Sequence, residues 1–326
     1  MESSKNCTLK LALLKKVFYS LFVLSSTTDV FAIGGVHVPF TNIIRANAPM
    51  MQSIYSDSTG LKTGTPCSAV LLDKNHIITA LHCINKGDYV PNAVNNYYFN
   101  SLAIYLYLPP SLQNMNFSNN AFIYNPSIDN STFMKDFNPK GIVKFYNGQD
   151  IYIPQSDNNG HIPDLAIVKL DKSVEYANNY GWVDIRLPSN NITKNDLTDH
   201  QTRITGWSAN PTIVDTENPE DVFGGYLRYS ALNNPQVSTT EIVADNHVCG
   251  GDSGGGIFFG GAILYGINSY GEEPYFYDVA NGQCYRKVHA VNIFKYKTWI
   301  ESVLKGSIKA TCKVNKQGNN ICKVGK

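Results

Sequence analysis

The sequence predicts an all-β protein made of many short strands and closed by one C-terminal helix. Among its 326 residues are 20 tyrosines and 15 phenylalanines, while 25 glycines and 15 prolines interrupt the chain. That mixture is typical of short strands joined by turns. Only 16% of the residues are charged, well below the roughly 25% of an average domain, which excludes a coiled coil or a charge-driven disordered chain.

The expected strands are short apolar or alternating runs separated by turn-forming residues, without the strand–helix alternation of a parallel sheet. They lie at 68–72, 76–79, 101–108, 141–145, 165–170, 201–207, 225–229, 255–259, 262–268 and 288–291. The helix follows them and ends at Gly306. Its apolar residues are Phe294, Trp299, Ile300, Val303 and Leu304. Residues 88–138, rich in Asn, Tyr and Ser, are predicted as a loop insertion, and the basic tail 307–326 as a solvated extension.

The first 32 residues have the organisation of a secretory signal peptide. Lysines at positions 5, 10, 15 and 16 precede an apolar run at 17–24, and a small residue, Ala32, follows Phe31. The run is far shorter than the ~20 residues needed to span a bilayer, so no transmembrane anchor is expected. The segment predicts export, to a periplasm or out of the cell, with cleavage after Ala32.

The cysteines and the net charge narrow the chemistry further. Cys7 would leave with the signal peptide, and an even number of cysteines would remain, which suggests disulfides in an oxidising compartment. They are Cys67, Cys83, Cys249, Cys284, Cys312 and Cys322. Their spacing does not choose among the possible pairings, and no zinc-binding motif is present, so no metal is expected. A formal net charge of +1 predicts no nucleic-acid partner.

The glycine-rich run at 249–256 surrounds Ser253 and indicates nucleophilic catalysis. A serine hydroxyl attacks only when a base removes its proton, and the resulting oxyanion needs preorganised N–H donors. Two further residues could complete such a site. His82 follows the apolar run 76–79 closely, and Asp164 precedes the run 165–170. A nucleophile, a base and a group to orient the base therefore occur in the order His, Asp, Ser.

Taken together, these motifs resemble those of chymotrypsin/trypsin-like serine proteases, a secreted family. The segment 79–83 resembles the family's Thr-Ala-Ala-His-Cys signature, with Leu81 in place of an alanine. The segment 251–255 matches the nucleophile signature without change, and Asp164 with the strand after it resembles the acid segment. Shorter matches at 206–207, 268–271 and 299–300 extend the resemblance from about residue 33 to residue 305.

The resemblance implies a role for each matched residue. Ser253 would be the nucleophile, His82 the general base, and Asp164 the group that orients the imidazole. The N–H groups of Gly251 and Ser253 would form the oxyanion hole. The implied activity is peptide-bond hydrolysis through an acyl-enzyme intermediate, by a monomer that acts on protein or peptide substrates without a cofactor.

The family fold is two packed six-stranded antiparallel β-barrels, with the active site between them and the C-terminal helix packed on the body. This domain would span residues 33–306, with the insertion at about 88–138 and the tail at 307–326. The implied disulfides are Cys67–Cys83 beside the histidine, Cys249–Cys284 beside the substrate pocket and, by exclusion, Cys312–Cys322 as a hairpin in the tail.

The resemblance also suggests how the chain matures. Cleavage after Ala32 would expose Ile33, followed by two glycines and a valine, which resembles the family's mature start with one residue missing. In that family the new α-ammonium pairs with the Asp beside the nucleophile, here Asp252. Cleavage after Arg45 is the alternative, although the residues from Ala46 onward resemble an activated start poorly.

The primary specificity pocket is expected to have His247, six places before the nucleophile, at its base. Val248 and the stretch Ser269, Tyr270 and Gly271 would form its walls. An imidazole lacks the fixed negative charge that would compensate the desolvation of a substrate Lys or Arg, so cleavage after basic residues is disfavoured.

Two kinds of pocket fit these residues. His247 can donate a hydrogen bond, and Arg286 and Lys287 lie in the segment that would close the pocket, a combination that suits an acidic or polar side chain. The alternative is a mostly apolar pocket, narrowed by Val248, Tyr270 and Val288.

Two functions other than a protease fit parts of this sequence. The Gly-x-Ser-x-Gly pattern around Ser253 also fits an α/β-hydrolase esterase, whose His must follow the Ser; His289 is the one histidine available for it. Glycines 254–256 make a poor helix start, which disfavours that fold. A catalytically silent homologue that binds partners is the second alternative. Loss of a triad residue is its usual mark, and none is lost here.

Overall fold

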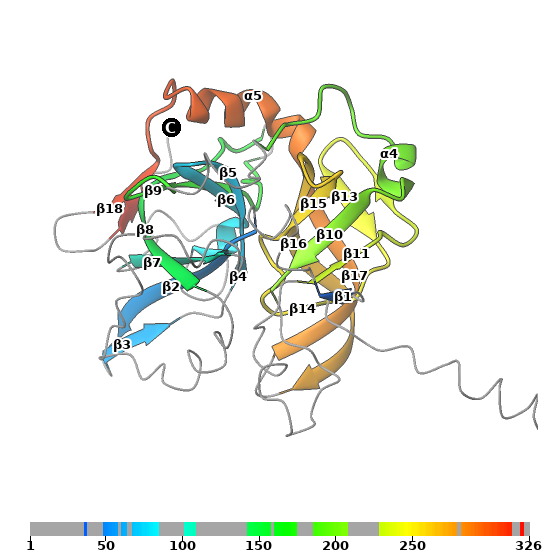
Figure 1. Ribbon diagram of the computed structural model, residues 1–326, viewed down its shortest axis with the longest axis horizontal. Coiled ribbons are helices and arrows are strands. Elements are labelled where there is room, and N and C mark those ends of the chain that lie inside the picture. The colour runs from blue at the N-terminus through cyan, green and yellow to red at the C-terminus, as the bar shows by residue number, and fades with distance from the viewer. Residues whose placement is uncertain are drawn as a thin grey trace, which may run out of the picture. The chain divides into compact units, whose positions relative to one another are not determined.

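The computed structural model describes residues 36–37, 48–57, 60–63, 67–84, 101–108, 142–157, 160–174, 185–207, 228–278, 282–314 and 320–322. These residues form two antiparallel sheets and few helices (Figure 1). The predicted signal peptide, Ile33 and Arg45 lie outside the described ranges, as does most of the predicted insertion. No helix in these ranges is both long and apolar enough to cross a bilayer.

The first sheet has ten strands among the described residues, in the order β3-β2-β7-β8-β9-β6-β5, with β4 on β2, β18 on β8 and β19 on β18. Their bounds are β2 Met50–Asp57, β3 Gly60–Thr63, β4 Cys67–Ser68, β5 Val70–Asp73, β6 His76–Thr79, β7 Ser101–Leu108, β8 Ile142–Tyr152, β9 Ala166–Leu170, β18 Cys312–Val314 and β19 Asn320–Cys322.

The second sheet has nine strands in the described chain, in the order β1-β11-β10-β15-β16-β17-β13-β12, with β14 on β17. Their bounds are β1 Val36–His37, β10 Thr202–Gly206, β11 Arg228–Ser230, β12 Gln236–Val237, β13 Glu241–Ala244, β14 Val248–Cys249, β15 Gly256–Phe259, β16 Ile263–Asp278 and β17 Gly282–Asn292. The predicted all-β trypsin-like fold is confirmed. In the described residues each of its two antiparallel β units has more than the six strands predicted for a barrel.

The helices of the described residues are the one-turn η2 (Leu81–Cys83), α4 (Lys194–Thr198) and α5 (Ile293–Leu304). The side chain of Asn292 caps α5 by accepting the N–H of Phe294 at 3.1 Å, and Gly306 follows its end with a φ of 72°. This confirms the predicted C-terminal helix and its glycine stop. The short α4 was missed, although Thr193 and Asp196 form a capping box at its start.

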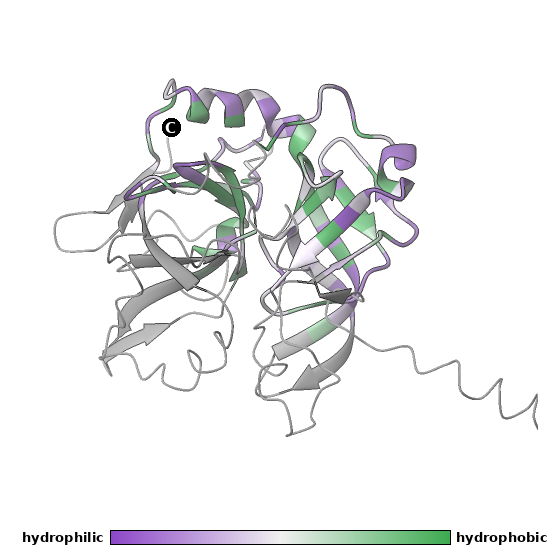
Figure 2. Ribbon diagram, viewed as in Figure 1, coloured by the Kyte–Doolittle hydropathy of each residue, from purple (hydrophilic) through white to green (hydrophobic). Residues whose placement is uncertain are grey.

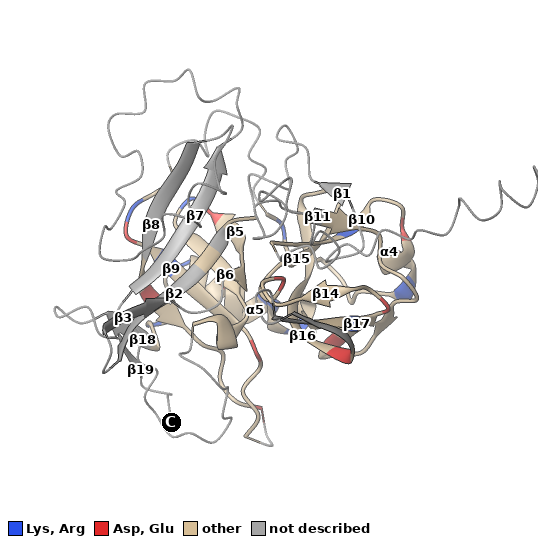
Figure 3. Cartoon of the chain, turned by 90° about the horizontal axis from the view of Figure 1, so that it is seen from below, with Lys and Arg blue, Asp and Glu red and all other residues tan. Residues whose placement is uncertain are grey.

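In the described part of the chain, three apolar clusters form the core, and the largest joins the sheets. It combines Val70, Ile78 and Ile167 of the first sheet with Phe258 and Ile267 of the second. Buried residues of α5 complete it, so the helix covers the line along which the sheets meet. Figure 2 shows hydrophobic residues concentrated on these strands, whereas charged residues of both signs are spread over the described elements (Figure 3).

The C-terminal tail corrects one prediction, because its first part is not a solvated extension. The N–H of Thr311 donates to the carbonyl of Ile151 at 2.7 Å, and β18 pairs with β8 at Cys312↔Ile151. The pairing of β7 with β8 ends at Asn147, which leaves the edge of β8 near Ile151 open for another strand. Cys312 faces Cys322 in the β18–β19 register. Their side chains lie outside the described part, so this disulfide stays a prediction.

The predicted insertion at 88–138 also contains a strand of the first sheet. β7 pairs with β2 on one side and with β8 on the other, in agreement with the strand predicted at 101–108. The rest of that range lies outside the described residues.

The two sheets are in direct contact where Ser68 binds the loop between β14 and β15. The N–H of Ser68 donates to the carbonyl of Ser253 at 2.7 Å, and its hydroxyl donates to the carbonyl of Gly251 at 2.8 Å. Gly254 has a φ of 82°, and a Cβ placed on it would lie 2.0 Å from the carbonyl oxygen of Ser68. Only glycine fits this contact.

We therefore expect Gly254→Ala to destabilise the protein by roughly 2–5 kcal/mol, the sum of left-handed backbone strain and overpacking. Denaturant unfolding followed by tryptophan fluorescence measures the effect. Gly160→Ala is the matched control, because Gly160 also has a positive φ (78°) but nothing lies within 4 Å of its Cβ position. Equal losses in the two variants would contradict the steric explanation.

Candidate active site

The pairing of two strands in the first sheet brings His82 and Asp164 together. β6 and β9 are antiparallel, with Thr79 opposite Ala166. The residues just after β6 and those just before β9 therefore lie at the same end of the sheet. His82 sits there in η2, and Asp164 sits in the turn that precedes β9.

Asp164 accepts hydrogen bonds from two residues that the sequence places far apart. Its Oδ1 accepts the N–H of His82 at 2.9 Å, and its Oδ2 lies 2.7 Å from Nδ1 of His82. The hydroxyl of Ser269 donates to the same Oδ2 at 2.5 Å. Burial raises the pKa of the Asp164 carboxyl group. The hydrogen bonds and charge of His82, together with the hydrogen bond from the Ser269 hydroxyl, lower this pKa by a larger amount, so the net pKa lies below the usual 3.8.

Ser269 lies in a β-bulge and contacts both Asp164 and Ser253. The register between β16 and β17 shifts between Asn268 and Tyr270, and such an irregularity re-aims the residue within it. The Ser269 hydroxyl faces Asp164, while its carbonyl accepts the hydroxyl of Ser253 at 3.3 Å. A continuous hydrogen-bonded path therefore runs from His82 through Asp164 and Ser269 to Ser253. The hydroxyl of Ser253 donates to this carbonyl and not to the imidazole.

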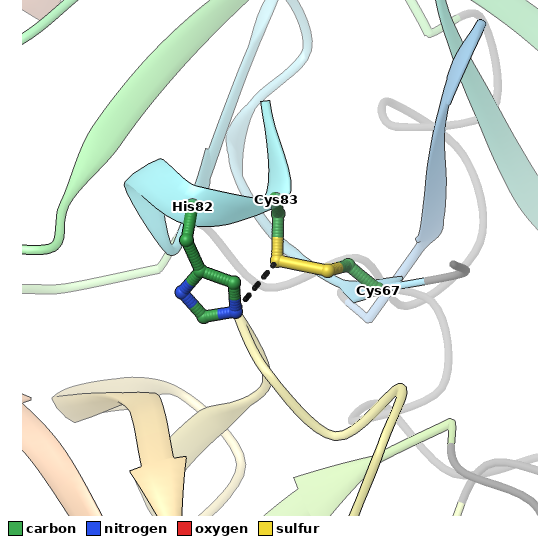
Figure 4. A group of neighbouring side chains, drawn as sticks. All are labelled: Cys67, His82 and Cys83. Atoms are coloured by element: carbon green, nitrogen blue, oxygen red, sulfur yellow. Dashed lines mark hydrogen bonds between the residues drawn. A yellow bond between two sulfur atoms is a disulfide. The ribbon is translucent and has the colours of Figure 1, made fainter. Parts of the chain in front are cut away.

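One sulfur atom lies between the imidazole and the Ser253 backbone. Figure 4 shows His82 beside the Cys67–Cys83 disulfide, with Nε2 at 3.8 Å from Sγ of Cys83. The carbonyl oxygen of Ser253 contacts the same sulfur at 3.7 Å. The imidazole of His82 and the backbone of Ser253 thus contact the same atom of this disulfide. His82 and the two cysteines do not form a metal site, because the sulfurs are bonded to each other and are not thiolates.

The loop that carries Ser253 also presents backbone N–H groups. The N–H groups of Asp252, Gly254 and Gly255 donate to the carbonyls of Cys249, Asn268 and Asp252, respectively. Among the described residues, no acceptor pairs with the N–H of Gly251 or Ser253. Gly251 has a φ of 105°, a backbone conformation that glycine adopts readily.

The predicted pocket residues lie on neighbouring strands of the second sheet. The Cys249–Cys284 disulfide joins β14 to β17, next to buried Val248. His247 precedes β14, and burial, then the positive charge of Arg286, lower the pKa of its imidazole. This imidazole is therefore neutral near pH 7. Tyr270 and Gly271 follow Ser269 on β16, and the Tyr270 side chain is 51% exposed.

The remaining predicted site residue, Asp252, is 1% exposed, and its Oδ2 accepts the N–H of Cys249 at 2.9 Å. Its proposed partner, Ile33, lies outside the described residues.

Sequence reasoning missed two residues that hold the Ser253 loop. Ser68 binds it from the first sheet, as described above. Asn268 accepts the N–H of Gly254 through its carbonyl, and its Nδ2 donates to the carbonyl of Asp252 at 3.2 Å. Asn268 was noted only as part of a family match, and no local signal marks Ser68.

The position of His289 counts against the esterase alternative. Its Nδ1 lies 2.9 Å from Oε1 of Glu241, and its ring stacks on Tyr270 with 4.3 Å between centroids. Ser253 lies between strands β14 and β15, whereas the esterase fold requires a strand-to-helix turn.

The lowered pKa of Asp164 predicts how stability depends on pH. A carboxyl group with a folded-state pKa below 3.8 stabilises the fold above that pH, and this contribution disappears as the pH falls through the folded-state pKa. We expect Asp164→Asn to cost roughly 1–3 kcal/mol at pH 7, because the amide cannot accept all the hydrogen bonds that the carboxylate accepts from His82 and Ser269. The cost should shrink in acid.

Denaturant unfolding of both proteins from pH 7 down to below pH 3 checks this expectation. Asp245→Asn, at an exposed position, measures the general effect of the substitution. A difference between wild type and Asp164→Asn that stays constant over this range would show that the carboxylate charge is not responsible.

Comparisons with known proteins give concordant results. A family model described as Trypsin matches residues 127–300, just over half of the chain, including Asp164 and Ser253 but not His82. The renal glandular kallikrein of Mastomys natalensis is 26% identical over 249 residues, which cover 73% of this chain and 80% of that protein. The beta-fibrinogenase of Macrovipera lebetinus is 28% identical over 162 residues, which cover 46% of this chain and 57% of that protein.

Among solved structures, a mutant of human heparin binding protein matches the fold with a TM-score of 0.50 at 13% identity. The match covers 85% of this chain and 99% of that one.

Proposed function

The chain belongs to the trypsin family, and from this premise we propose that it is a secreted serine endopeptidase with His82, Asp164 and Ser253 as its catalytic triad. The observation that carries the proposal is the hydrogen-bonded path from His82 through Asp164 and Ser269 to Ser253. It joins residues that are far apart in the sequence and includes the pair of His82 and Asp164 that would orient a general base.

The contact between Nδ1 of His82 and Asp164 favours the tautomer with its proton on Nδ1, which leaves the lone pair on Nε2. In the proposed reaction, Nε2 takes the proton of Ser253 as its oxygen bonds to the substrate carbonyl carbon. The protonated imidazole then gives that proton to the leaving amine as the C–N bond breaks. Water then attacks the acyl carbon while the same Nε2 takes its proton. The imidazolium returns that proton to the Ser253 oxygen as the ester C–O bond breaks and the carboxylic acid product leaves.

The N–H groups of Gly251 and Ser253 would bind the oxyanion of each tetrahedral intermediate. The Ser253 hydroxyl, which donates to the carbonyl of Ser269 at 3.3 Å, must turn toward Nε2 to react. Catalytic hydrogen bonds are often incomplete without substrate, and rotation about one side-chain torsion is fast.

Two disulfides support the proposed export of the protein, since such bonds persist in oxidising compartments. We propose residues 1–32 as the signal peptide and a monomer as the active form. The proposed substrates are proteins or peptides cut after a non-basic residue. The neutral His247 and the charge of Arg286 beside it would not compensate a buried Lys or Arg.

A catalytically silent binding protein is the second candidate, because the Ser253 hydroxyl does not contact His82 directly. A serine-directed fluorophosphonate probe separates the two. Covalent labelling of Ser253 in the mature protein supports the enzyme, and lack of labelling supports the binding protein.

Replacing the nucleophile should abolish activity and leave the fold intact, because Ser253 contributes a hydroxyl and not core packing. We expect Ser253→Ala to reduce peptide hydrolysis by a factor of about 10⁴ or more, with an unchanged unfolding temperature. Ser302→Ala is the control, because it removes a hydroxyl that binds only within α5, to the carbonyl of Thr298. This variant should keep full activity. Substantial hydrolysis by Ser253→Ala would identify a different nucleophile.

We also propose that the active chain begins at Ile33, whose α-ammonium would pair with Asp252. Burial of Asp252 supports this, because a buried carboxylate needs a compensating charge or hydrogen bonds. N-terminal sequencing of the active protein should read Ile-Gly-Gly-Val. A sequence beginning at Ala46 would instead support cleavage after Arg45.

A further inference from the structure

Tyr285 lies between the two walls of the proposed specificity pocket. Val248 on β14 and Tyr285 on β17 are partners across the strand pair, next to the disulfide that joins Cys249 to Cys284. The opposite wall is formed by Ser269, Tyr270 and Gly271 on β16, which pairs with the other edge of β17. Tyr285 therefore lies on the strand that pairs with both walls of the proposed pocket.

The ring of Tyr285 lies against Gly271 on β16, in the other wall of the proposed pocket. A Cβ placed on Gly271 would lie 2.4 Å from Cγ and 2.5 Å from Cδ2 of Tyr285. The backbone of Gly271 and the Tyr285 side chain are thus in direct contact, with no room for a further atom between them. Successive residues of a strand point to opposite faces, and exposed Tyr270 points away from this contact.

Apolar packing holds the ring in this place. Tyr285 packs against the core cluster of the second sheet, which includes Val248, Ile242 and Val288. Moving an aromatic ring out of such an environment exposes apolar surface, which costs free energy in proportion to the area. A substrate side chain would have to supply that free energy before it could enter.

We propose that Tyr285 fills the primary specificity pocket and restricts the residue before the cleaved bond to a small uncharged side chain, such as that of glycine, alanine or serine. This inference rests on the proposed function and names its substrate class. A large apolar side chain would collide with the ring. A basic one would in addition meet Arg286 and a neutral His247. The selectivity then depends on one residue of β17 that takes no part in bond cleavage.

A peptide library cleaved by the wild type and by Tyr285→Ala tests the substrate class. The wild type should cut after small residues, and Tyr285→Ala should raise kcat/KM for leucine or phenylalanine at that position by at least ~10-fold, about 1.4 kcal/mol of transition-state stabilisation. Tyr296→Ala, a partly buried tyrosine on α5, should keep the wild-type profile. Wild-type cleavage after large residues, with the same profile in Tyr285→Ala, would overturn the proposal.

A second experiment measures ligand binding to the proposed pocket in proteins that all carry Ser253→Ala and are therefore inactive. Removing the ring should leave a cavity that binds p-cresol, the equivalent of the lost side chain, since apolar cavities bind matching ligands. Calorimetric titration should show saturable binding to Tyr285→Ala, but not to the protein with Tyr285 or to Tyr296→Ala. Equal binding in all three would overturn the proposed occupancy.

Gly271→Ala tests the contact with Tyr285 through protein stability, so this test does not depend on activity or ligand binding. Gly271 is not among the glycines with a positive φ, so the added methyl group acts through its contact with Tyr285. It should lower the unfolding temperature by several degrees when Tyr285 is present and by much less with Tyr285→Ala. Equal shifts in the two backgrounds would contradict the contact.

The experiments separate the two proposals. If p-cresol binds only to Tyr285→Ala while the fluorophosphonate probe leaves Ser253 unlabelled, the proposed function fails and the occupied pocket stands. If Ser253 is labelled and p-cresol binding does not depend on Tyr285, the proposed function stands and the proposed filling of the pocket by Tyr285 fails.

Discussion

The close approach of the two sheets at Ser68 and Gly254 is the constraint on which the rest of the structure depends. Ser68 binds the second sheet through its N–H and hydroxyl, and its carbonyl accepts the hydroxyl of Thr79 at the end of β6. One residue therefore holds both the loop that carries Ser253 and the strand that leads to His82. A side chain at position 254 would push these parts away from each other.

The partly buried carboxylate of Asp164 adds an electrostatic constraint. A charge away from water is tolerated only when its oxygens receive hydrogen bonds. Asp164 receives them from His82, which follows β6 in the first sheet, and from Ser269, in the bulge of β16 in the second. Its ionised form is therefore fully satisfied only when both sheets are assembled. Folding and the arrangement of the candidate site are coupled through this one group.

The groups proposed for bond cleavage and those proposed for selectivity depend on different parts of the second sheet. Ser253 and its N–H neighbours lie in the loop between β14 and β15, held by Asn268 and Ser68. The proposed pocket lies at β14, β16 and β17, with Tyr285 packed against the core cluster of that sheet. In the proposed enzyme, the size of the pocket could change through Tyr285 while the reacting groups keep their positions.

The sequence by itself determined the all-β class, α5 and the residues that could carry chemistry, because each of these is recorded in a local pattern. The runs around His82, Asp164 and Ser253 are such patterns, and so is the glycine after α5. Only the tertiary structure decided the bulge at Ser269, the pairing of β18 with β8 and the contact between Tyr285 and Gly271. These features depend on strand register and on the approach of segments far apart in the chain, which no local pattern encodes.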